Sequence, residues 1–125
     1  MSGGITLDTG ALIALERRRD RALRLIRAAH ARGRLVTVPV VVVAEWWRGR
    51  TDLREAIVST LLVESMTVSL ARSAGEAVAD IPDATIVDAI VMASAAVRGD
   101  AVLTSDVDDL TRLQRHFPDV RILAV

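Results

Sequence analysis

Short apolar segments alternate with longer segments of helical pattern, and this alternation limits the fold more than any other feature of the chain. The strand-like segments cover residues 5–7, 35–38, 66–68, 101–104 and 121–125. Helical periodicity or composition is expected over residues 9–15, 20–32, 39–48, 52–64, 70–79, 84–98 and 107–116. Strands that alternate with helices indicate a parallel sheet covered by helices on both faces. In such sheets, ligands bind beyond the carboxyl ends of the strands.

Several element boundaries carry local signals. Gly33 and Gly99 are expected to end helices. Pro39 is expected at the first position of its helix, although the valine run that follows it is also strand-like. We prefer the helix because proline is disfavoured in a central strand. Asp83 is expected to be the N-cap of the helix over residues 84–98.

Length and composition indicate a single small domain without disulfide bonds. The 125 residues are expected to form a single domain over residues 1–125, with 51% hydrophobic residues to supply its core. The chain has no cysteine and only two histidines, far apart, which argues against thiolate and zinc sites. No apolar run reaches the roughly 18–20 residues that a membrane span needs, and residues 1–4 lack the features of a signal peptide. We therefore expect a cytoplasmic protein without a membrane segment.

The charged residues exclude two classes of function. Their net charge is zero, which argues against nucleic-acid binding by bulk electrostatics. All basic residues are arginine, a composition that a GC-rich genome explains. Because lysine is absent, chemistry that needs a Schiff base, a P-loop lysine or the lysine of a receiver domain is excluded.

Four carboxylates stand inside or directly after apolar segments, where a charge is costly. Asp8 follows residues 5–7, Glu45 follows the apolar run after Pro39, Asp88 interrupts a nearly apolar helix, and Asp106 follows the segment ending at Ser105. An unpaired buried carboxylate costs several kcal/mol or shifts its pKa. A hard divalent cation held by oxygen ligands would compensate all four at once.

Each of these carboxylates also has a structural explanation. Asp8 fits a helix N-cap, at about even odds on capping statistics. Glu45 fits an ordinary exposed helix position, and Asp88 fits pairing with a buried partner from elsewhere in the chain. Asp106 and Asp109 have the spacing of a helix capping box. Asp8 as a phosphatase nucleophile is disfavoured because the usual second aspartate is Gly10 here.

The four acidic residues and their flanking segments resemble the PIN-domain ribonuclease family, especially the VapC-type toxins. The resemblance rests on residues 5–15 around Asp8, on Val38-Pro39 followed by Glu45, on residues 87–96 around Asp88, and on residues 102–110 around Asp106. The family has the order Asp, Glu, Asp, Asp, and this chain keeps it. The tandem Trp46-Trp47 is not part of this motif, and we expect one of the two side chains near an interaction surface.

The resemblance implies a fold, an activity and partners. The fold would be a PIN-like three-layer α/β/α sandwich with a central, mainly parallel sheet. The activity would be that of a Mg²⁺- or Mn²⁺-dependent endoribonuclease, the toxin of a type II toxin–antitoxin system. It would act as a homodimer on RNA and be inhibited by a small antitoxin protein. The implied catalytic and metal-binding residues are Asp8, Glu45, Asp88 and Asp106, and the expected supporting residues are Thr9, Thr104 and Asp109.

Three other functions compete with this interpretation. A housekeeping RNA-processing PIN nuclease would have the same chemistry. A catalytically silent PIN-like interaction module would be expected to lack an acid, and none of the four is missing. A receiver or phosphatase that uses an aspartate nucleophile usually needs a lysine, which this chain does not have.

Overall fold

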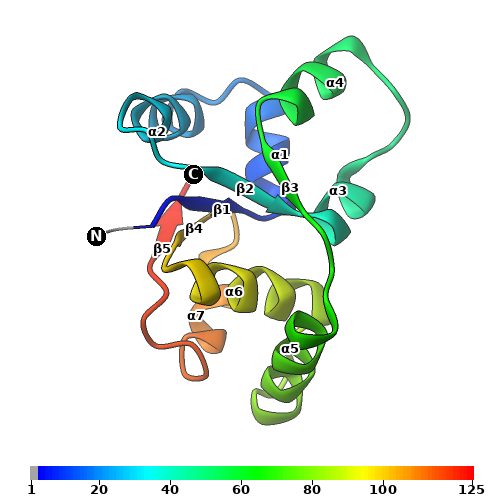
Figure 1. Ribbon diagram of the computed structural model, residues 1–125, viewed down its shortest axis with the longest axis vertical. Helices are drawn as coiled ribbons and strands as arrows, with labels where there is room; N and C mark the ends of the chain where they lie inside the picture. Colours follow the sequence, from blue (N-terminus) through cyan, green and yellow to red (C-terminus); the bar gives the residue numbers. More distant parts are fainter. Residues whose placement is uncertain (1–2) are drawn as a thin grey trace.

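Five parallel strands form a central sheet in the order β3-β2-β1-β4-β5 (Figure 1). The computed structural model describes residues 3–125. Met1 and Ser2, which belong to the expected domain over residues 1–125 and to the N-terminal segment over residues 1–4, lie outside the described residues. The strands are β1 (Ile5–Leu7), β2 (Val36–Pro39), β3 (Leu62–Glu64), β4 (Ala101–Thr104) and β5 (Ile122–Ala124). The expected parallel α/β class is confirmed.

Helices cover both faces of this sheet and give three layers. Figure 1 shows α1, α2 and α4 on one side of the sheet and α5, α6 and α7 on the other, with α3 beside the end of β2. The helices are α1 (Thr9–Glu16), α2 (Asp20–Ala31), α3 (Val40–Trp46), α4 (Asp52–Ser59), α5 (Val68–Asp80), α6 (Ile86–Arg98) and α7 (Val107–Leu113). Among the helices of residues 3–125, none combines the length and apolarity that a membrane crossing requires.

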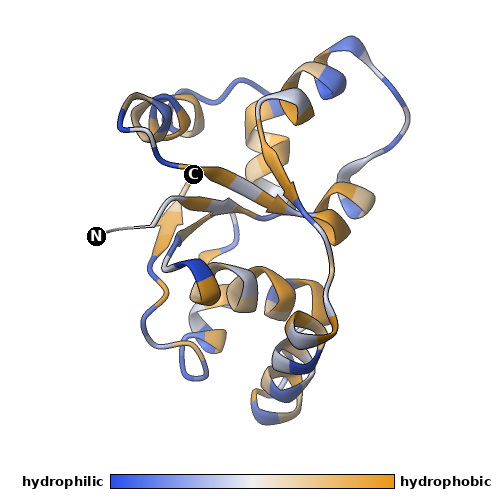
Figure 2. Ribbon diagram, viewed as in Figure 1, coloured by the Kyte–Doolittle hydropathy of each residue, from blue (hydrophilic) through white to orange (hydrophobic). Residues whose placement is uncertain are grey.

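The core lies on both sides of the three middle strands β2, β1 and β4. Leu7, Val38, Val102 and Leu103 are completely buried, as expected for strands that helices cover on both faces. Every residue of α6 from Ala89 to Ala95 is buried as well. Figure 2 shows the strands mostly in hydrophobic colours, whereas loops and outer helix surfaces are largely hydrophilic.

The third strand and the helix before it differ from the sequence expectation. The expected helix over residues 52–64 ends at Ser59, and β3 covers Leu62–Glu64 instead of residues 66–68. Pairing with β2 fixes this position, because Val63 lies opposite Val38. Thr67 then caps α5 by accepting a hydrogen bond from the Leu70 backbone N–H at 3.1 Å, so that helix begins at Val68. The strand is at the edge of the sheet, where Leu62 stays 50% exposed.

Other helix boundaries also differ, among them the end of α3 at Trp46 rather than residue 48, whereas the two glycine signals are confirmed. Pro39 is the last residue of β2, paired with Glu64, and α3 begins at Val40. Thr85 caps α6, because Asp83 lies in the preceding turn with a φ of 66°. Helix α7 ends at Leu113, before the expected residue 116. Gly33 and Gly99 follow helix ends with φ values of 69° and 70°, the left-handed conformation that favours glycine.

Candidate active site

The strand order reverses between β1 and β4, and this switch point positions Asp8 and Asp106. From β1 the chain builds the sheet outward through β2 and β3, whereas β4 and β5 lie on the other side. Asp8 directly follows β1, and Asp106 lies two residues beyond the end of β4. The backbone N–H of Asp8 donates to the Leu103 carbonyl at 3.3 Å, which holds the two strand ends together. Open α/β sheets bind their ligands at this kind of edge.

Asp8 is the buried carboxylate of the site. Its side chain caps α1 by accepting a hydrogen bond from the Ala11 backbone N–H at 2.8 Å, so the capping interpretation is confirmed. The Thr104 hydroxyl donates to its other oxygen. Burial raises the pKa of Asp8 to about 6, even though these two hydrogen bonds lower it. The charges of Asp88 and Asp106 raise this pKa further.

Thr104 connects the two aspartates at the switch point. Its hydroxyl donates to Asp8 and accepts a hydrogen bond from the Asp106 backbone N–H at 2.8 Å. Both groups are thereby fixed relative to the end of β4. A hydroxyl in this position orients a carboxylate without adding charge.

Gly10 permits the close approach of the two turns that carry Asp8 and Asp106. A Cβ atom on Gly10 would lie 2.0 Å from the Ser105 hydroxyl oxygen, closer than atoms can pack. The first turn of α1 therefore rests directly on the segment after β4. The sequence indicated a turn here but not this contact, which joins distant parts of the chain.

Asp88 lies in the first turn of α6 and is half-buried. Its backbone N–H donates to the Thr85 hydroxyl at 3.2 Å. Burial raises the pKa of the Asp88 carboxyl, and the carboxylates of Asp109 and Glu45 raise it further. Asp88 thus lies close enough to acidic residues on α3 and α7 for their charges to act on it. The sequence indicated this proximity only because parallel strands end at a common edge.

Glu45 and Asp106 are exposed, which corrects the expectation that all four acids are buried. Helix α3 turns Val42 and Trp46 inward, and this leaves Glu45 facing outward. The Thr9 hydroxyl donates a hydrogen bond to the Glu45 carboxylate and so links α1 to α3. The need for a compensating cation, as argued from burial, applies fully to Asp8 and partly to Asp88.

The residues after Asp106 form a small charged group rather than a capping box. Asp106 occupies the N-cap position of α7, but its side chain makes no capping hydrogen bond. A hydrogen bond to Asp109 raises the pKa of Asp106 and lowers that of Asp109. The Arg112 guanidinium donates to Asp109 at 2.6 Å. Arg112 was not expected at the site from the sequence, although its spacing of three residues from Asp109 is typical of a helical ion pair.

Trp46 and Trp47 have different environments. Trp46 is buried in the core, and its indole N–H donates to Glu16 at 3.0 Å. Trp47 is half-buried, with its ring edge against Trp46 and the ring centres 6.0 Å apart. Trp47 therefore supplies most of the exposed surface of this tandem, whereas Trp46 is only 3% exposed.

The structure brings five carboxylates toward one edge of the sheet, and we call Asp8, Glu45, Asp88, Asp106 and Asp109 the acid cluster. They come from the β1–α1 and β4–α7 junctions and from α3, α6 and α7. The charges of neighbouring acids raise the pKa values of Asp8, Asp88 and Asp106, so the group is electrostatically coupled. Such a group favours a cation.

The donor atoms of the acid cluster suit magnesium or manganese. All are carboxylate oxygens, which hard cations prefer. Within residues 3–125, no three His, Cys, Asp or Glu side chains stand together as a complete metal-binding group. Mg²⁺ needs no such group, because it binds through one or two carboxylates and keeps several water ligands. Asp8, buried and coupled to its acidic neighbours, fits the position of a central ligand.

The fold is similar to that of several solved VapBC and FitAB structures. A chain of VapBC2 from Rickettsia felis, bound to a DNA fragment from its promoter, matches at 13% identity with a TM-score of 0.74, covering 97% of this chain and 98% of that one. DNA-bound VapBC from Salmonella typhimurium matches at 19% identity with a TM-score of 0.71, covering 98% of each chain. FitAB bound to the IR36 DNA fragment matches at 16% identity with a TM-score of 0.71, covering 96% of this chain and 94% of that one.

At these identities the solved structures show the fold alone. No curated protein sequence matches the chain. A family model described as the PIN domain matches residues 5–115, which span β1 to the end of α7 and include every member of the acid cluster. The sequence resemblance is thereby confirmed, and the chain belongs to the PIN-domain family.

Proposed function

We propose that this protein is a Mg²⁺- or Mn²⁺-dependent endoribonuclease and the toxin of a type II toxin–antitoxin pair. The observation that supports the proposal most directly is the acid cluster at the switch point of the sheet, on a chain of a family whose members are typically nucleases. The sequence order of its acids is the order that the family resemblance implies. Clustered carboxylates would repel the phosphate of a nucleic acid, so they serve a nuclease by binding a cation that contacts this phosphate.

Some residues of the site would bind the cation, and others orient the residues that bind it. Asp8, with Asp88 or Asp106, would hold the cation directly, and the other acids of the cluster, Glu45 and Asp109 among them, would contact its water ligands. A cation bound there would offset the charge of the scissile phosphate and make water more acidic. Thr104 keeps the Asp8 carboxylate in one orientation, and Thr9 does the same for Glu45.

The exposed Glu45 and the buried Asp8 are suited to different steps of the reaction. Asp8 is buried and accepts two hydrogen bonds, from the Ala11 backbone and from Thr104, so its carboxylate is suited to hold a cation rather than to contact the attacking water. Glu45 is exposed and held by Thr9 beside the cluster, so it is suited to accept the proton released when water attacks phosphorus. The P–O bond to the leaving ribose oxygen breaks as the new P–O bond forms, and solvent protonates the leaving oxygen.

The toxin assignment rests on the likeness to VapBC and FitAB structures. On that basis we infer a small antitoxin protein as partner, a homodimeric toxin and action on RNA in the cytoplasm. A housekeeping RNA-processing nuclease would share the acid cluster, whereas a silent PIN-like module would have no use for it.

The proposal is tested by RNA cleavage with purified variants. We expect the wild type to cleave total RNA of the expression host with Mn²⁺, and not after chelation with EDTA. Asp8→Asn should lower the rate by about 100-fold or more, because it removes a charge while keeping the side-chain volume. Asp108→Asn is the matched control, since Asp108 is exposed in the same region as Asp106. The metal-nuclease proposal is wrong if folded Asp8→Asn cleaves as fast as the wild type, or if EDTA has no effect.

Expression in cells tests the toxin role separately. We expect the wild type to slow growth and Asp8→Asn to relieve this effect. Co-expression of the protein encoded by the neighbouring small gene should restore growth if that protein is the antitoxin. Cleavage in vitro without any growth effect would favour the housekeeping nuclease.

A further inference from the structure

A cleft opens beside the acid cluster, between α1, α3 and the loop that leads to α4. Its volume is about 590 Å³. Thr9 and Glu45, which link α1 to α3 at the cluster, form part of its lining. The cleft therefore begins at the candidate active site and extends away from it. Arg17, Arg48 and Arg54 also line it, with Glu16 as the only other acid.

One of these arginines is already neutralised. The Arg54 guanidinium pairs with the Glu16 carboxylate at 3.1 Å and donates to the Gly49 carbonyl at 2.9 Å. Glu16 in turn accepts the hydrogen bond from the Trp46 indole. The Glu16–Arg54 pair and Trp46 thus form a fixed wall, in which the two charges offset each other.

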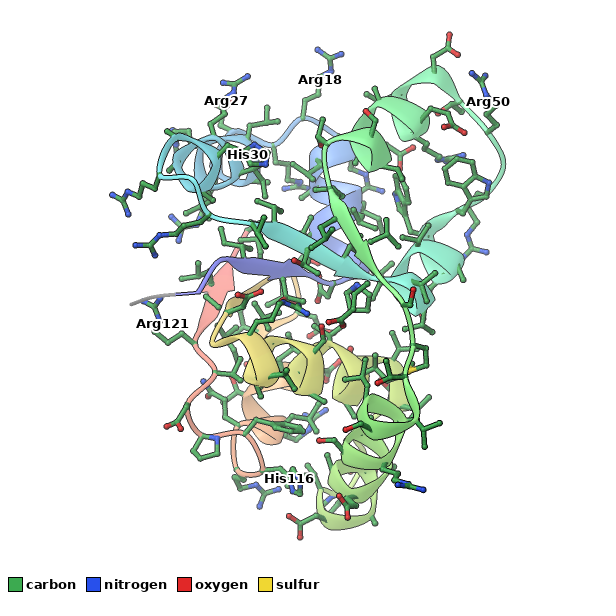
Figure 3. All side chains as sticks on the ribbon, viewed as in Figure 1. Arg18, Arg27, His30, Arg50, His116 and Arg121 are labelled. Atoms are coloured by element: carbon green, nitrogen blue, oxygen red, sulfur yellow. The ribbon has the colours of Figure 1, made fainter. Side chains whose placement is uncertain are left out.

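Arg17 and Arg48 are the available positive charges of the cleft. Both are exposed, and within residues 3–125 neither forms a salt bridge. The neighbouring arginines differ from them. Arg50 pairs with Asp52 at 3.1 Å and points away from the molecule in Figure 3, where Arg18 also points outward. Arg48, just after α3, and Arg17, at the end of α1 opposite to Asp8, therefore give the cleft two positive charges along its path away from the acid cluster.

We propose that Arg17 and Arg48 bind backbone phosphates of the substrate RNA on one side of the scissile phosphate, so that the strand leaves the acid cluster through this cleft. The inference rests on the proposed nuclease function and names the residues that hold its substrate. The chain has no net positive charge to attract RNA, and the acid cluster repels the RNA backbone. Binding therefore needs local cations, and arginine is suited to phosphate because its planar group donates two parallel hydrogen bonds.

The size of the cleft favours a single strand. Its volume is in the range of pockets that enclose small ligands, so it can take up a short flexible segment. Unpaired RNA can bend its backbone into such a space. A rigid duplex would meet only the rim.

The first test compares kinetics on a synthetic single-stranded RNA that contains a cut site mapped with the wild type. Arg17→Ala and Arg48→Ala should each raise KM by about two- to fivefold at low salt, as expected for exposed ionic contacts, with a smaller effect on kcat. The matched controls are the single variants Arg24→Ala and Arg72→Ala, each of which removes one positive charge from an exposed position on α2 or α5, away from the cleft. Their double variant is the control where both cleft arginines are removed.

The second test locates the contact on the RNA. Each phosphate near the cut is replaced in turn by an uncharged methylphosphonate. At the phosphate that Arg17 or Arg48 binds, the replacement should raise KM for the wild type but add nothing further to the corresponding alanine variant. Such non-additivity is a direct measure of contact, and a merely structural role for the arginines would not produce it.

A binding assay separates this inference from the nuclease proposal. In the Asp8→Asn background, the affinity for the labelled RNA is measured by fluorescence anisotropy at several salt concentrations. Removing both arginines should lower the slope of log K against log salt by about 0.7 for each phosphate that the protein no longer binds. A slope and KM equal to those of the Arg24→Ala/Arg72→Ala control would overturn the inference. A wild type that cleaves no RNA would instead overturn the nuclease proposal, and the binding assay would still decide whether the arginines hold RNA.

Discussion

The Asp8 carboxyl binds a proton more tightly in the folded protein than in the unfolded chain. Burial raises its pKa from 3.8 to about 6. Between these two values the folded state holds the proton that the unfolded state has released. The contribution of Asp8 to stability is therefore greatest below about pH 4, and it disappears as the pH rises toward 6. At neutral pH the metal-free protein carries a buried charge that weakens the fold.

Asp8→Asn is therefore expected to stabilise the metal-free protein at pH 7. The free energy of unfolding should rise by about 1–3 kcal/mol relative to the wild type, as the difference in pKa implies. The gain should shrink at pH 4, where Asp8 is largely protonated. Urea unfolding in EDTA at both pH values measures this, with Asp108→Asn as an exposed control. An equal loss of stability at both pH values would show instead that the hydrogen bonds with Ala11 and Thr104 dominate.

The role of Asp8 as a cap was predictable from sequence, whereas the pairing of other charges was not. Capping depends on residues within one turn, so Asp8 followed by a helical segment was sufficient. Glu16 and Arg54 are far apart in the chain, and no local pattern joins them. The exposure of Glu45 depends on which face of α3 packs inward, and the valines of that helix gave no clear polar face.

At the scale of elements, the end of α6 is tied to three strands by one arginine. Arg98 forms an ion pair with Glu64 at the end of β3 and another with Asp100, before β4, at 3.0 Å. It also donates to the Thr6 hydroxyl on β1 at 2.7 Å. The Asp100 side chain is only 3% exposed, and its polar contacts are with Arg98, the Thr6 hydroxyl and the Gly4 backbone N–H.

Removal of this arginine should destabilise the fold without touching the acid cluster. We expect Arg98→Ala to lower the free energy of unfolding by about 3 kcal/mol, because Asp100 is left charged and buried without its cation. Adding Asp100→Asn should recover part of the loss. Arg72→Ala, on the exposed side of α5, is the control and should change stability little. Thermal or urea unfolding decides this, and a loss no larger than in the control would contradict the prediction.

Element boundaries were predictable where the signal was local. Gly33 and Gly99 mark helix ends because their conformation excludes most side chains. The position of β3 depended instead on pairing with β2, and the apolar residues before Glu64 continue the helical pattern of α4. A strand at a sheet edge adds little local hydrophobic signal, so its register cannot be assigned from its own residues.

At the scale of the whole molecule, equal numbers of acidic and basic residues hide an uneven distribution. Arg98 and Arg54 neutralise acids away from the switch point, whereas within residues 3–125 only Arg112 pairs with a member of the acid cluster. The sequence predicted the convergence of acids because parallel strands end at one edge. The sequence could not show that most of the paired arginines lie away from these acids. The acid cluster of the folded protein therefore carries negative charge that the arginines only partly neutralise.

A divalent cation should consequently stabilise the entire fold. Mn²⁺ at about 100 times its Kd would add about 2.7 kcal/mol, which corresponds to a rise in Tm of roughly 8–10 °C for a chain of this length. The rise should be absent in Asp8→Asn, retained in Asp108→Asn and reversed by EDTA. It should also be smaller at pH 5 than at pH 7, because protons compete for a carboxyl whose pKa is about 6. Calorimetry of the three proteins at both pH values is decisive: an equal rise in Tm for Asp8→Asn would place the cation outside the acid cluster.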